Sequence, residues 1–214
     1  MKLENYELHL PSYSVGKEVY NQIGKICKPY GTKVLVIGGK KALSAAYDKI
    51  SKNAVEGGLD IIGKEIYGTD CTYEAVERLA ALTSFQEADM VFAVGGGKAI
   101  DTCKCLCIEC EKPVFTFPTI ASNCAACTSV SIMYHEDGTF FKPHFFTHPA
   151  AHAFIDTQII AAAPYRYLWA GIGDTYAKNY EAEISSRGEK LPHYTKVGVG
   201  FSKMCLTPML EYGR

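Results

Sequence analysis

Three glycines and a lysine, Gly95-Gly96-Gly97-Lys98, are the residues of this sequence best suited to chemistry. They follow the apolar run Asp89–Val94 and precede a stretch compatible with a helix. Glycines at the end of a buried strand let backbone N–H groups close on an anion, and the helix that begins there adds the positive end of its dipole. Lys98 would stand in the first helical turn, where it needs a negative partner such as a phosphate. The alternative is a tight strand-to-helix turn with a solvated lysine, and the spacing of a Walker loop is absent.

The elements that must position this turn follow a repeating strand and helix pattern. Apolar runs predict strands, and helical spacing predicts helices, over Lys33–Gly39 (strand), Lys41–Glu56 (helix), Ile61–Tyr67 (strand), Tyr73–Glu87 (helix), Met90–Val94 (strand) and Val114–Phe117 (strand). Alternation of this kind predicts an α/β fold with a doubly wound parallel sheet. Ligands of such sheets bind beyond the carboxyl ends of the strands, where the glycines at 38–39 and 95–97 fall. Both groups of glycines therefore point to one crevice.

The pattern changes near residue 157. Ala161–Ala163 and Pro164 are followed by helix formers to Ser186 and by a further helical stretch near Val197–Leu210, with no strand pattern. We therefore predict an α/β domain over residues 1–157 and a helical segment over residues 158–214.

Composition restricts the class of partner. The 214 residues are 48% hydrophobic, enough for one full core, and the net charge of −1 provides no basic surface for nucleic acid. The sequence lacks a run of about 18 apolar residues that could cross a membrane, and its start carries Glu4 where a signal peptide would be basic and then apolar. Nine cysteines at irregular spacing fit a reducing compartment. We expect a cytoplasmic protein whose partners are small molecules or copies of itself.

Three stretches in a fixed order resemble the iron-containing alcohol dehydrogenase superfamily, in particular its glycerol dehydrogenase-like branch. They are Gly95–Lys104, Phe117–Tyr134 and Ala163–Ala182, and Leu10–Gly16 is similar to the family's opening strand and turn. The resemblance implies a dinucleotide-binding α/β domain followed by an all-helical domain, and a homo-oligomer when the chain is full length. It also implies NAD or NADP and a divalent metal, zinc or iron, in the cleft between the domains.

The resemblance assigns cofactor contacts residue by residue. Gly95, Gly96 and Gly97 match the positions that wrap the pyrophosphate, with Lys98 beside it. Asp101 and Lys104 repeat the family's helix pattern, but one helical turn apart they could equally be an exposed ion pair.

Further assigned positions lie beyond the glycine turn. Thr119 and Ser122 match positions on the adenine and ribose side of the cofactor, and Thr128, Val130 and Tyr134 match positions around the nicotinamide ribose. The alternative for these residues is a hydroxyl-rich strand edge.

Asp174 matches the one metal-ligating carboxylate that the family places between its domains. The alternative is an aspartate at a helix N-terminus, which the helix dipole favours. In the family two histidines farther along complete the metal site, and this sequence stops before they would occur. One carboxylate does not hold a divalent ion, so we expect either a fragment of a longer enzyme or a truncated product without the metal-dependent step.

Two other groups of residues resemble metal sites less well. His144, His148 and His152 are spaced by four residues, but Pro143 and Pro149 argue against one continuous helix. The helical period places Cys103, Cys107 and Cys110 on one face and Cys105 elsewhere, which we interpret as small buried residues.

Two departures from the family pattern bear on specificity. Cys124 stands where glycerol dehydrogenases carry an aspartate that binds the polyol, so the pocket no longer repels an anionic substrate. Gly39 stands at a strand end where NAD-preferring relatives carry an aspartate for the ribose hydroxyls. With Lys40 and Lys41 beside it, a 2′-phosphate becomes tolerable.

These residues lead to one principal hypothesis. It is a metal-dependent, NAD(P)-linked oxidoreductase that transfers a hydride between nicotinamide and a small alcohol, polyol or hydroxy acid, with the 2-oxoacid or hydroxycarboxylate type favoured. The alternative is a truncated, catalytically silent nucleotide-binding remnant. A glycerol-1-phosphate dehydrogenase is less favoured because no cluster of basic residues for a substrate phosphate is visible.

Overall fold

The computed structural model describes residues 7–213, which form two compact units. The larger unit comprises His9–Ile120 and Cys124–Ala163, and the smaller unit contains the chain after Pro164 together with Ala121–Asn123. Within the described residues, no helix combines the length and the apolar character needed to span a bilayer.

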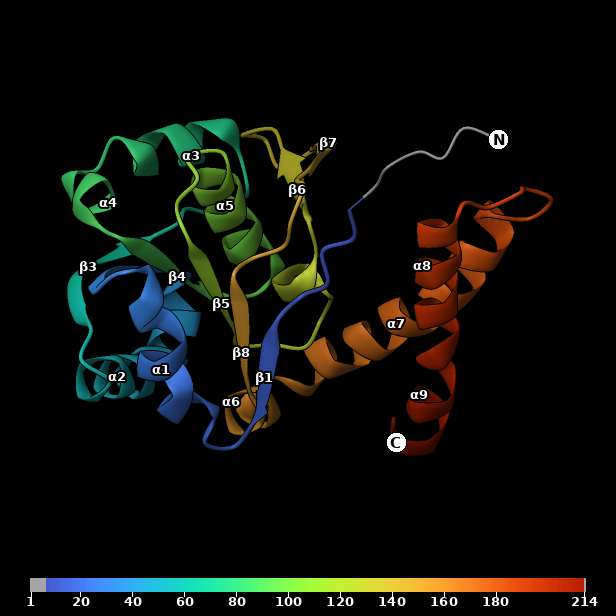
Figure 1. The fold of residues 1–214 in the computed structure, drawn as a ribbon, viewed down its shortest axis with the longest axis horizontal. Coiled ribbons are helices and arrows are strands. Elements are labelled where there is room, and N and C mark those ends of the chain that lie inside the picture. The colour runs from blue at the N-terminus through green and yellow to red at the C-terminus, as the bar shows by residue number, and fades with distance from the viewer. Residues whose placement is uncertain (1–6, 214) are drawn as a thin grey trace. The chain divides into compact units, whose positions relative to one another are not determined.

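The larger unit is a six-stranded sheet between two layers of helices (Figure 1). Its order is β1-β8-β5-β4-β2-β3, and all neighbouring strands are parallel. The strands are β1 (Tyr13–Gly16), β2 (Lys33–Gly38), β3 (Asp60–Ile66), β4 (Met90–Gly95), β5 (Val114–Pro118) and β8 (His152–Asp156). The predicted α/β fold with a parallel, doubly wound sheet is confirmed.

Helices cover both faces of this sheet. They are α1 (Ile23–Cys27) and α2 (Lys40–Glu56) on one face, and α3 (Tyr73–Ala80), α4 (Thr83–Glu87) and α5 (Gly97–Ile108) on the other. Along β2, Val34 and Val36 pack on the α2 side, while Leu35 and Ile37 pack on the α5 side. Strands buried on both faces are continuous apolar runs, and this property made β2 and β4 predictable.

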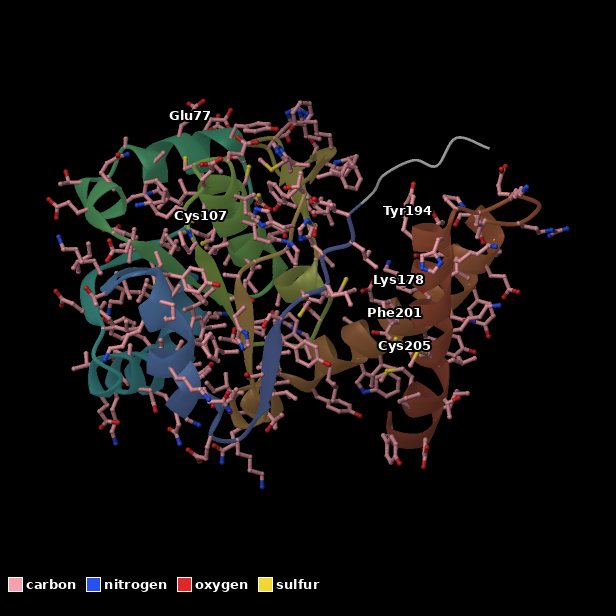
Figure 2. All side chains as sticks on the ribbon, in the orientation of Figure 1. Glu77, Cys107, Lys178, Tyr194, Phe201 and Cys205 are labelled. Atoms are coloured by element: carbon pink, nitrogen blue, oxygen red, sulfur yellow. The ribbon has the colours of Figure 1, made fainter. Side chains whose placement is uncertain are left out.

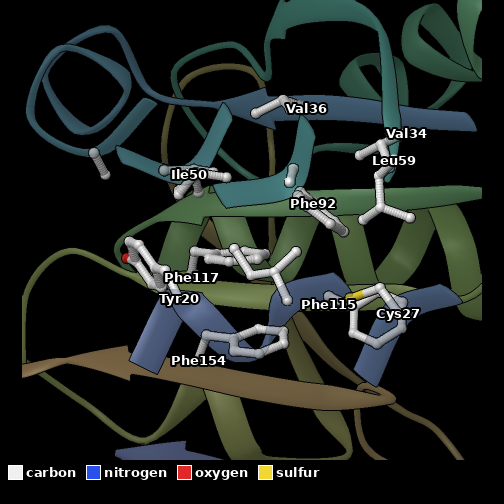
Figure 3. Packing of buried hydrophobic residues seen from close by; sticks show 14 of the residues in the cluster. Tyr20, Cys27, Val34, Val36, Ile50, Leu59, Phe92, Phe115, Phe117 and Phe154 are labelled. Carbon is white, nitrogen blue, oxygen red and sulfur yellow. The ribbon is translucent and has the colours of Figure 1, made fainter. Parts of the chain in front are cut away.

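An aromatic cluster fills the core on the α2 side (Figure 3). Phe92, Phe117 and Phe154 come from strands β4, β5 and β8, and the rings of Phe117 and Phe154 stack with centroids 5.0 Å apart. Tyr20 meets Phe117 edge to face at 5.4 Å. Each such pair adds about 0.5–1.5 kcal/mol beyond the burial of its area. The cluster therefore fixes the central strands relative to one another.

The structure contains elements that the sequence did not predict. Strand β8 was not predicted and lies beside β1, the opening strand that the resemblance of Leu10–Gly16 indicates. β6 (Val130–Tyr134) pairs with β7 (Phe140–Phe145) in a separate antiparallel hairpin. Short helical turns occur at η1 (Val19–Gln22), η2 (Lys28–Tyr30) and η3 (Ala125–Cys127). The hairpin was missed because β7 is exposed along most of its length and lacks an apolar alternation.

One predicted helix is wrong. The stretch Tyr73–Glu87 is divided into α3 and α4, because Leu82 adopts an extended backbone with ψ 134°. The Leu82 carbonyl accepts the N–H groups of Phe85 and Gln86 and so begins the second helix. Apolar spacing continued across this break and concealed it.

The smaller unit contains the helices expected after Pro164. They are α7 (Tyr165–Ser185), α8 (His193–Met204) and α9 (Leu206–Tyr212). Figure 2 labels Tyr194 and Phe201 on α8, and both are exposed. Among the residues described in these three helices, only Asn179 is buried. Helix α6 (Thr157–Ala162) groups with the larger unit, which extends to Ala163.

Candidate functional site

Two glycine turns lie side by side at the carboxyl edge of the sheet. Strand β2 leads through Gly39 into α2, and β4 leads through Gly95 and Gly96 into α5. β3 pairs with one side of β2, whereas β4 and then β5 follow on its other side. The order in which successive strands are placed in the sheet therefore reverses between β2 and β4. The Gly39 N–H donates to the carbonyl of Val94 at 3.4 Å. The turns thus occupy the topological switch point, where α/β sheets bind ligands.

The turn from β4 to α5 requires glycine. Gly95 has a φ of 154°, and a Cβ there would lie 2.8 Å from the Cβ of Ala99. A Cβ on Gly96 would lie 2.6 Å from Cδ1 of Ile120. The carbonyl of Gly95 accepts the N–H of Thr119 at 3.1 Å, which ties the turn to the end of β5. Gly96 is the N-cap of α5, and no side chain forms a capping hydrogen bond with the amides that begin this helix.

The turn from β2 to α2 is more permissive at its second glycine. Gly39 is the N-cap of α2 with φ −81° and ψ 149°, a conformation open to every residue type. A Cβ there would meet only Cε1 of Tyr67, at an ordinary contact distance of 3.5 Å. Lys40 and Lys41 begin the helix and are exposed. This position can accept a side chain without changing the turn.

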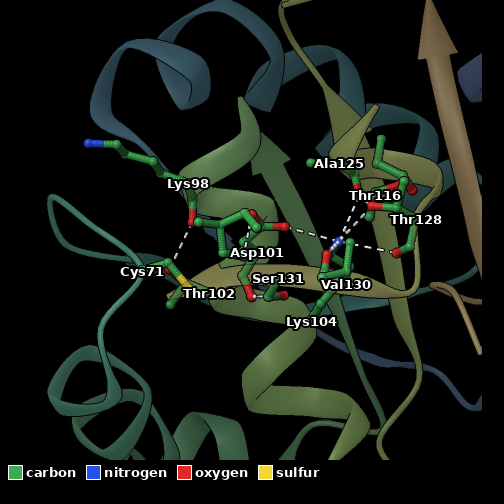
Figure 4. Close-up of polar contacts among 12 residues, drawn as sticks. Cys71, Lys98, Asp101, Thr102, Lys104, Thr116, Ala125, Thr128, Val130 and Ser131 are labelled. Atoms are coloured by element: carbon green, nitrogen blue, oxygen red, sulfur yellow. Dashed lines mark hydrogen bonds and ion pairs between the residues drawn. The ribbon is translucent and has the colours of Figure 1, made fainter. Parts of the chain in front are cut away.

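Lys98 has a negative partner within the chain. Its Nζ forms an ion pair with Asp70 and lies 5.2 Å from the centroid of the Tyr134 ring. The hydrogen bond to Asp70 raises the pKa of Lys98. The side chain is half exposed and, in Figure 4, points away from the buried cluster around Lys104. Lys98 is therefore a partly solvated lysine that already has a negative partner, Asp70, within the chain, and its place beside a bound phosphate stays a prediction.

Lys104 is the centre of that buried cluster (Figure 4). Its Nζ lies 3.0 Å from Asp101 and donates to the carbonyls of Ala125 at 2.9 Å and Val130 at 2.5 Å. Asp101 also accepts the N–H of Ile132 at 3.1 Å. Burial raises the pKa of Asp101, against the opposing effect of Lys104. The exposed ion pair considered from the sequence is wrong, because this pair holds the loop after β5 onto α5.

The residues predicted on the nicotinamide side follow this loop. Thr128 directly follows η3, with its hydroxyl 3.4 Å from Nζ of Lys104, and Val130 begins β6. Tyr134 ends β6 beside Lys98. Cys124 is exposed at the start of the loop. Thr128 and Val130 are thus held by Lys104, and Val130 and Tyr134 lie on β6, an edge strand of the two-stranded hairpin.

The two residues predicted on the adenine side are placed differently. Thr119 is buried directly after β5, and its N–H donates a hydrogen bond to the carbonyl of Gly95 in the glycine turn. Ser122 belongs to Ala121–Asn123, which groups with the smaller unit.

Asp174 lies in the middle of α7, so the alternative of a helix N-terminal aspartate is wrong. Its carboxylate is 3.4 Å from Nζ of Lys178, which also pairs with Glu181 at 3.1 Å. Within residues 7–213 no group of three His, Cys, Asp or Glu side chains could hold a metal. A single carboxylate paired with a lysine does not fit a divalent ion.

The three histidines do not converge. His144 lies on β7, bonded to Tyr73 and Glu109, whereas His152 lies on β8 between the hydroxyls of Ser12 and Ser14. His148 lies between these strands, which agrees with the interpretation that they do not form a helical metal site.

Cysteines of α5 are mostly core residues. Cys103, Cys105 and Cys107 are buried, and Cys107 points into the interior of the larger unit (Figure 2). Burial raises the pKa of Cys105 to about 12. Cys110 is exposed, because α5 ends at Ile108, so its predicted place on the buried face is wrong.

Sequence reasoning missed two residues of this site. Asp70 lies in the connection between β3 and α3, where no motif indicated an ion pair with Lys98. Thr116 looks like an ordinary strand residue, but its hydroxyl donates to the carbonyl of Ala126 at 3.0 Å.

Comparison with known proteins places the chain among dehydrogenases. The family model described as iron-containing alcohol dehydrogenase matches residues 11–156. A glycerol dehydrogenase of Escherichia coli is 31% identical over 94% of this chain and 56% of its own length. Hydroxycarboxylate dehydrogenase A of Escherichia coli is 34% identical over 78% of this chain and 46% of its own length.

Structural comparison gives the same result. The crystal structure of a probable glycerol dehydrogenase from Sinorhizobium meliloti superimposes with a TM-score of 0.82 and 26% identity, covering 97% of this chain and 58% of that protein. The chain spans about half the length of the curated relatives that it matches. Because the family model covers more than half of the sequence, the chain belongs to the iron-containing alcohol dehydrogenase family.

Proposed function

We propose that this chain supplies the nucleotide-binding part of a nicotinamide-dependent oxidoreductase acting on a small hydroxy compound. The observation that carries the proposal is the pair of adjacent glycine turns at the switch point, each beginning a helix without a side-chain cap. A dinucleotide has two phosphates and two riboses. The turn before α5 offers backbone amides to the phosphates, and the turn before α2 offers an open position to a ribose.

The cofactor would follow the carboxyl edge of the sheet. The amides at Gly95–Gly97 would bind the pyrophosphate, with Lys98 available to neutralise it. Gly39 would face the adenosine ribose, and Thr119 would line the adenine side. Because Gly39 leaves the ribose position uncharged, we propose that NADP(H) is accepted as well as NAD(H).

The loop after β5 would hold the nicotinamide end through Thr128, Val130 and Tyr134. A bound nicotinamide supplies the hydride acceptor or donor, and the chain's own residues fix its ring against the substrate. Lys104 contributes indirectly, because it holds the carbonyls that shape this loop. A metal that polarises the substrate oxygen would need ligands besides Asp174.

We propose a hydroxycarboxylate or 2-oxoacid as substrate in preference to glycerol. Related proteins include a glycerol dehydrogenase, a glycolaldehyde reductase and a hydroxycarboxylate dehydrogenase. In this chain Cys124 is exposed at the start of the loop and carries no carboxylate that would repel an anion.

Titration with NADH and with NADPH tests the proposal. We expect nicotinamide fluorescence to report saturable binding by the purified chain, and Gly198→Ala on α8, where a Cβ meets open space, to leave it unchanged. The metal ligands are incomplete within the described residues, which favours binding without turnover by this chain alone. Absence of saturable binding for both nucleotides would refute the proposal, and metal-dependent oxidation of a hydroxy acid by the chain would refute the silent alternative.

A further inference from the structure

We propose that Cys124 and Cys127 are a redox pair, which a hydroperoxide converts into an intramolecular disulfide in the loop after β5. The two cysteines are separated by two alanines, and both are thiols in the structure. The Cys-x-x-Cys spacing is typical of dithiols that cycle between reduced and oxidised forms. The spacing alone is weak, and three structural observations support it.

The backbone between the two cysteines has the correct shape. Ala125–Cys127 form the turn η3, and the N–H of Cys127 donates to the carbonyl of Cys124 at 3.0 Å. Side chains three residues apart eclipse one another in a 3-10 turn. Such turns keep the outer Cα atoms within about 7 Å, which overlaps the range of about 4.4–6.8 Å found across disulfides. The bond can form with little change in the backbone.

The turn is also held rigidly from below. Lys104 donates to the carbonyl of Ala125 at 2.9 Å, and the hydroxyl of Thr116 donates to the carbonyl of Ala126 at 3.0 Å. Both donors are buried. Because the turn is already ordered, the second thiol stays near the first, and closing the bridge costs little conformational entropy.

Access separates this pair from a second one. Cys107 and Cys110 have the same spacing and the same turn hydrogen bond, 3.1 Å from the Cys110 N–H to the Cys107 carbonyl. Cys107, however, is fully buried in the core. Cys124 is exposed and Cys127 is partly buried, so an oxidant reaches the first thiol more readily than the second. The chain therefore contains a natural control for the spacing.

The reaction balances with a hydroperoxide as oxidant. The sulfur of Cys124 attacks the peroxide oxygen, the O–O bond breaks, and a sulfenic acid forms with release of water or an alcohol. The sulfur of Cys127 then attacks that sulfur, the S–S bond forms, and the hydroxyl leaves as water. Two thiols lose two electrons and two protons, and the peroxide takes up both. Burial raises the pKa of Cys127, which fits the second role better than the first.

Thiol mapping after treatment with one equivalent of hydrogen peroxide tests this inference. We expect alkylation and peptide mass analysis of the wild-type chain to show a bridge between Cys124 and Cys127, with a loss of two hydrogens that dithiothreitol reverses. Cys127→Ser should instead leave a sulfenic acid on Cys124 that dimedone traps, and Cys110→Ser should behave as the wild type does.

Two results would overturn the inference: both thiols remain open to alkylation after peroxide, or the bridge maps to Cys110 in the wild type. The wild-type map does not depend on the folding of any variant. No nucleotide is present, so the result is independent of the proposed cofactor.

Discussion

The two glycine turns at the switch point look alike in sequence and differ in what they tolerate. At the end of β4, Gly95 adopts a φ of 154° and both Gly95 and Gly96 would place a Cβ closer than 3.0 Å to a neighbouring side chain. At the end of β2, Gly39 has an ordinary conformation and free space around it. The first turn is a geometric requirement, whereas Gly39 is one choice among several.

This difference separates the binding of the cofactor from the choice between NAD and NADP. A turn that excludes side chains keeps its amides free for a phosphate, which NAD and NADP share. Gly39 admits a side chain, although Gly38 before it does not, so this position can adjust to the ribose, where the two nucleotides differ.

Alanine substitution of each glycine tests the contrast in folding. Gly95→Ala should lower the free energy of unfolding by about 3 kcal/mol, because it combines backbone strain with crowding against Ala99. Gly39→Ala should change it by less than about 1 kcal/mol, in the stabilising direction, since it restricts the unfolded chain. Urea denaturation gives both values. Equal midpoints for the two variants would show that the turns do not differ.

The steric clash of a side chain at position 96 with Ile120 can be separated from the effect of that side chain on cofactor binding. Ile120→Val removes the Cδ1 atom that a Cβ on Gly96 would strike, so Gly96→Val is best made in that background. We expect the double variant to remain folded and to lose at least about tenfold in NADH affinity, roughly 1.4 kcal/mol, because the valine covers the amides. Ile120→Val alone is the control. Unchanged affinity in a folded double variant would place the pyrophosphate elsewhere.

Gly39→Asp should alter selection without altering the turn. A carboxylate there accepts hydrogen bonds from the ribose hydroxyls of NADH and repels the 2′-phosphate of NADPH. We expect NADPH affinity to fall by at least roughly tenfold, about 1.4 kcal/mol, with NADH equal or tighter. Gly39→Asn is the matched uncharged control. The same NADPH affinity in the aspartate variant and the original chain would mean that Gly39 does not face the ribose.

Asp70 should have the smallest effect. Its carboxylate pairs with Lys98 next to the proposed phosphate site and opposes the approach of another anion. Asp70→Asn keeps a hydrogen-bond acceptor and removes the charge, so NADH should bind about threefold tighter, roughly 0.6 kcal/mol, at low salt. Lys98→Met should weaken binding. Weaker binding in Asp70→Asn would indicate instead that Asp70 positions Lys98 for the cofactor.

Much of this arrangement was predictable from the sequence because the central strands are buried on both faces. Runs such as Met90–Val94 and the glycines after them identify strand ends without any knowledge of pairing. The change of pattern near residue 157 predicted the helical segment, and the metal-ligand role that the family resemblance assigns to Asp174 stays a prediction. Edge strand β1 and the hairpin strand β7 carry exposed residues, so their sequences lack that signal.

Side-chain partners were much less predictable than strands. The ion pair of Lys98 and Asp70 joins the first turn of α5 to the connection between β3 and α3, and the register of β2 against β3 and β4 brings these two segments together. Lys104 has an unremarkable helical spacing from Asp101, and its burial depends on β6 folding over α5. The spacing of residues in a sequence predicts contacts within one helix or strand, whereas these contacts join two elements that only the folded chain brings together.

The hydrogen bonds from Lys104 and Thr116 to the loop after β5 have a consequence for the evolution of this protein. Both bind backbone carbonyls, which every amino acid supplies. Residues outside the loop therefore determine its backbone conformation, and the side chains at 124–127 are not needed for these hydrogen bonds. Mutations there can sample new pockets on an unchanged frame, so a family with this anchoring can diversify its substrates while its fold stays constant.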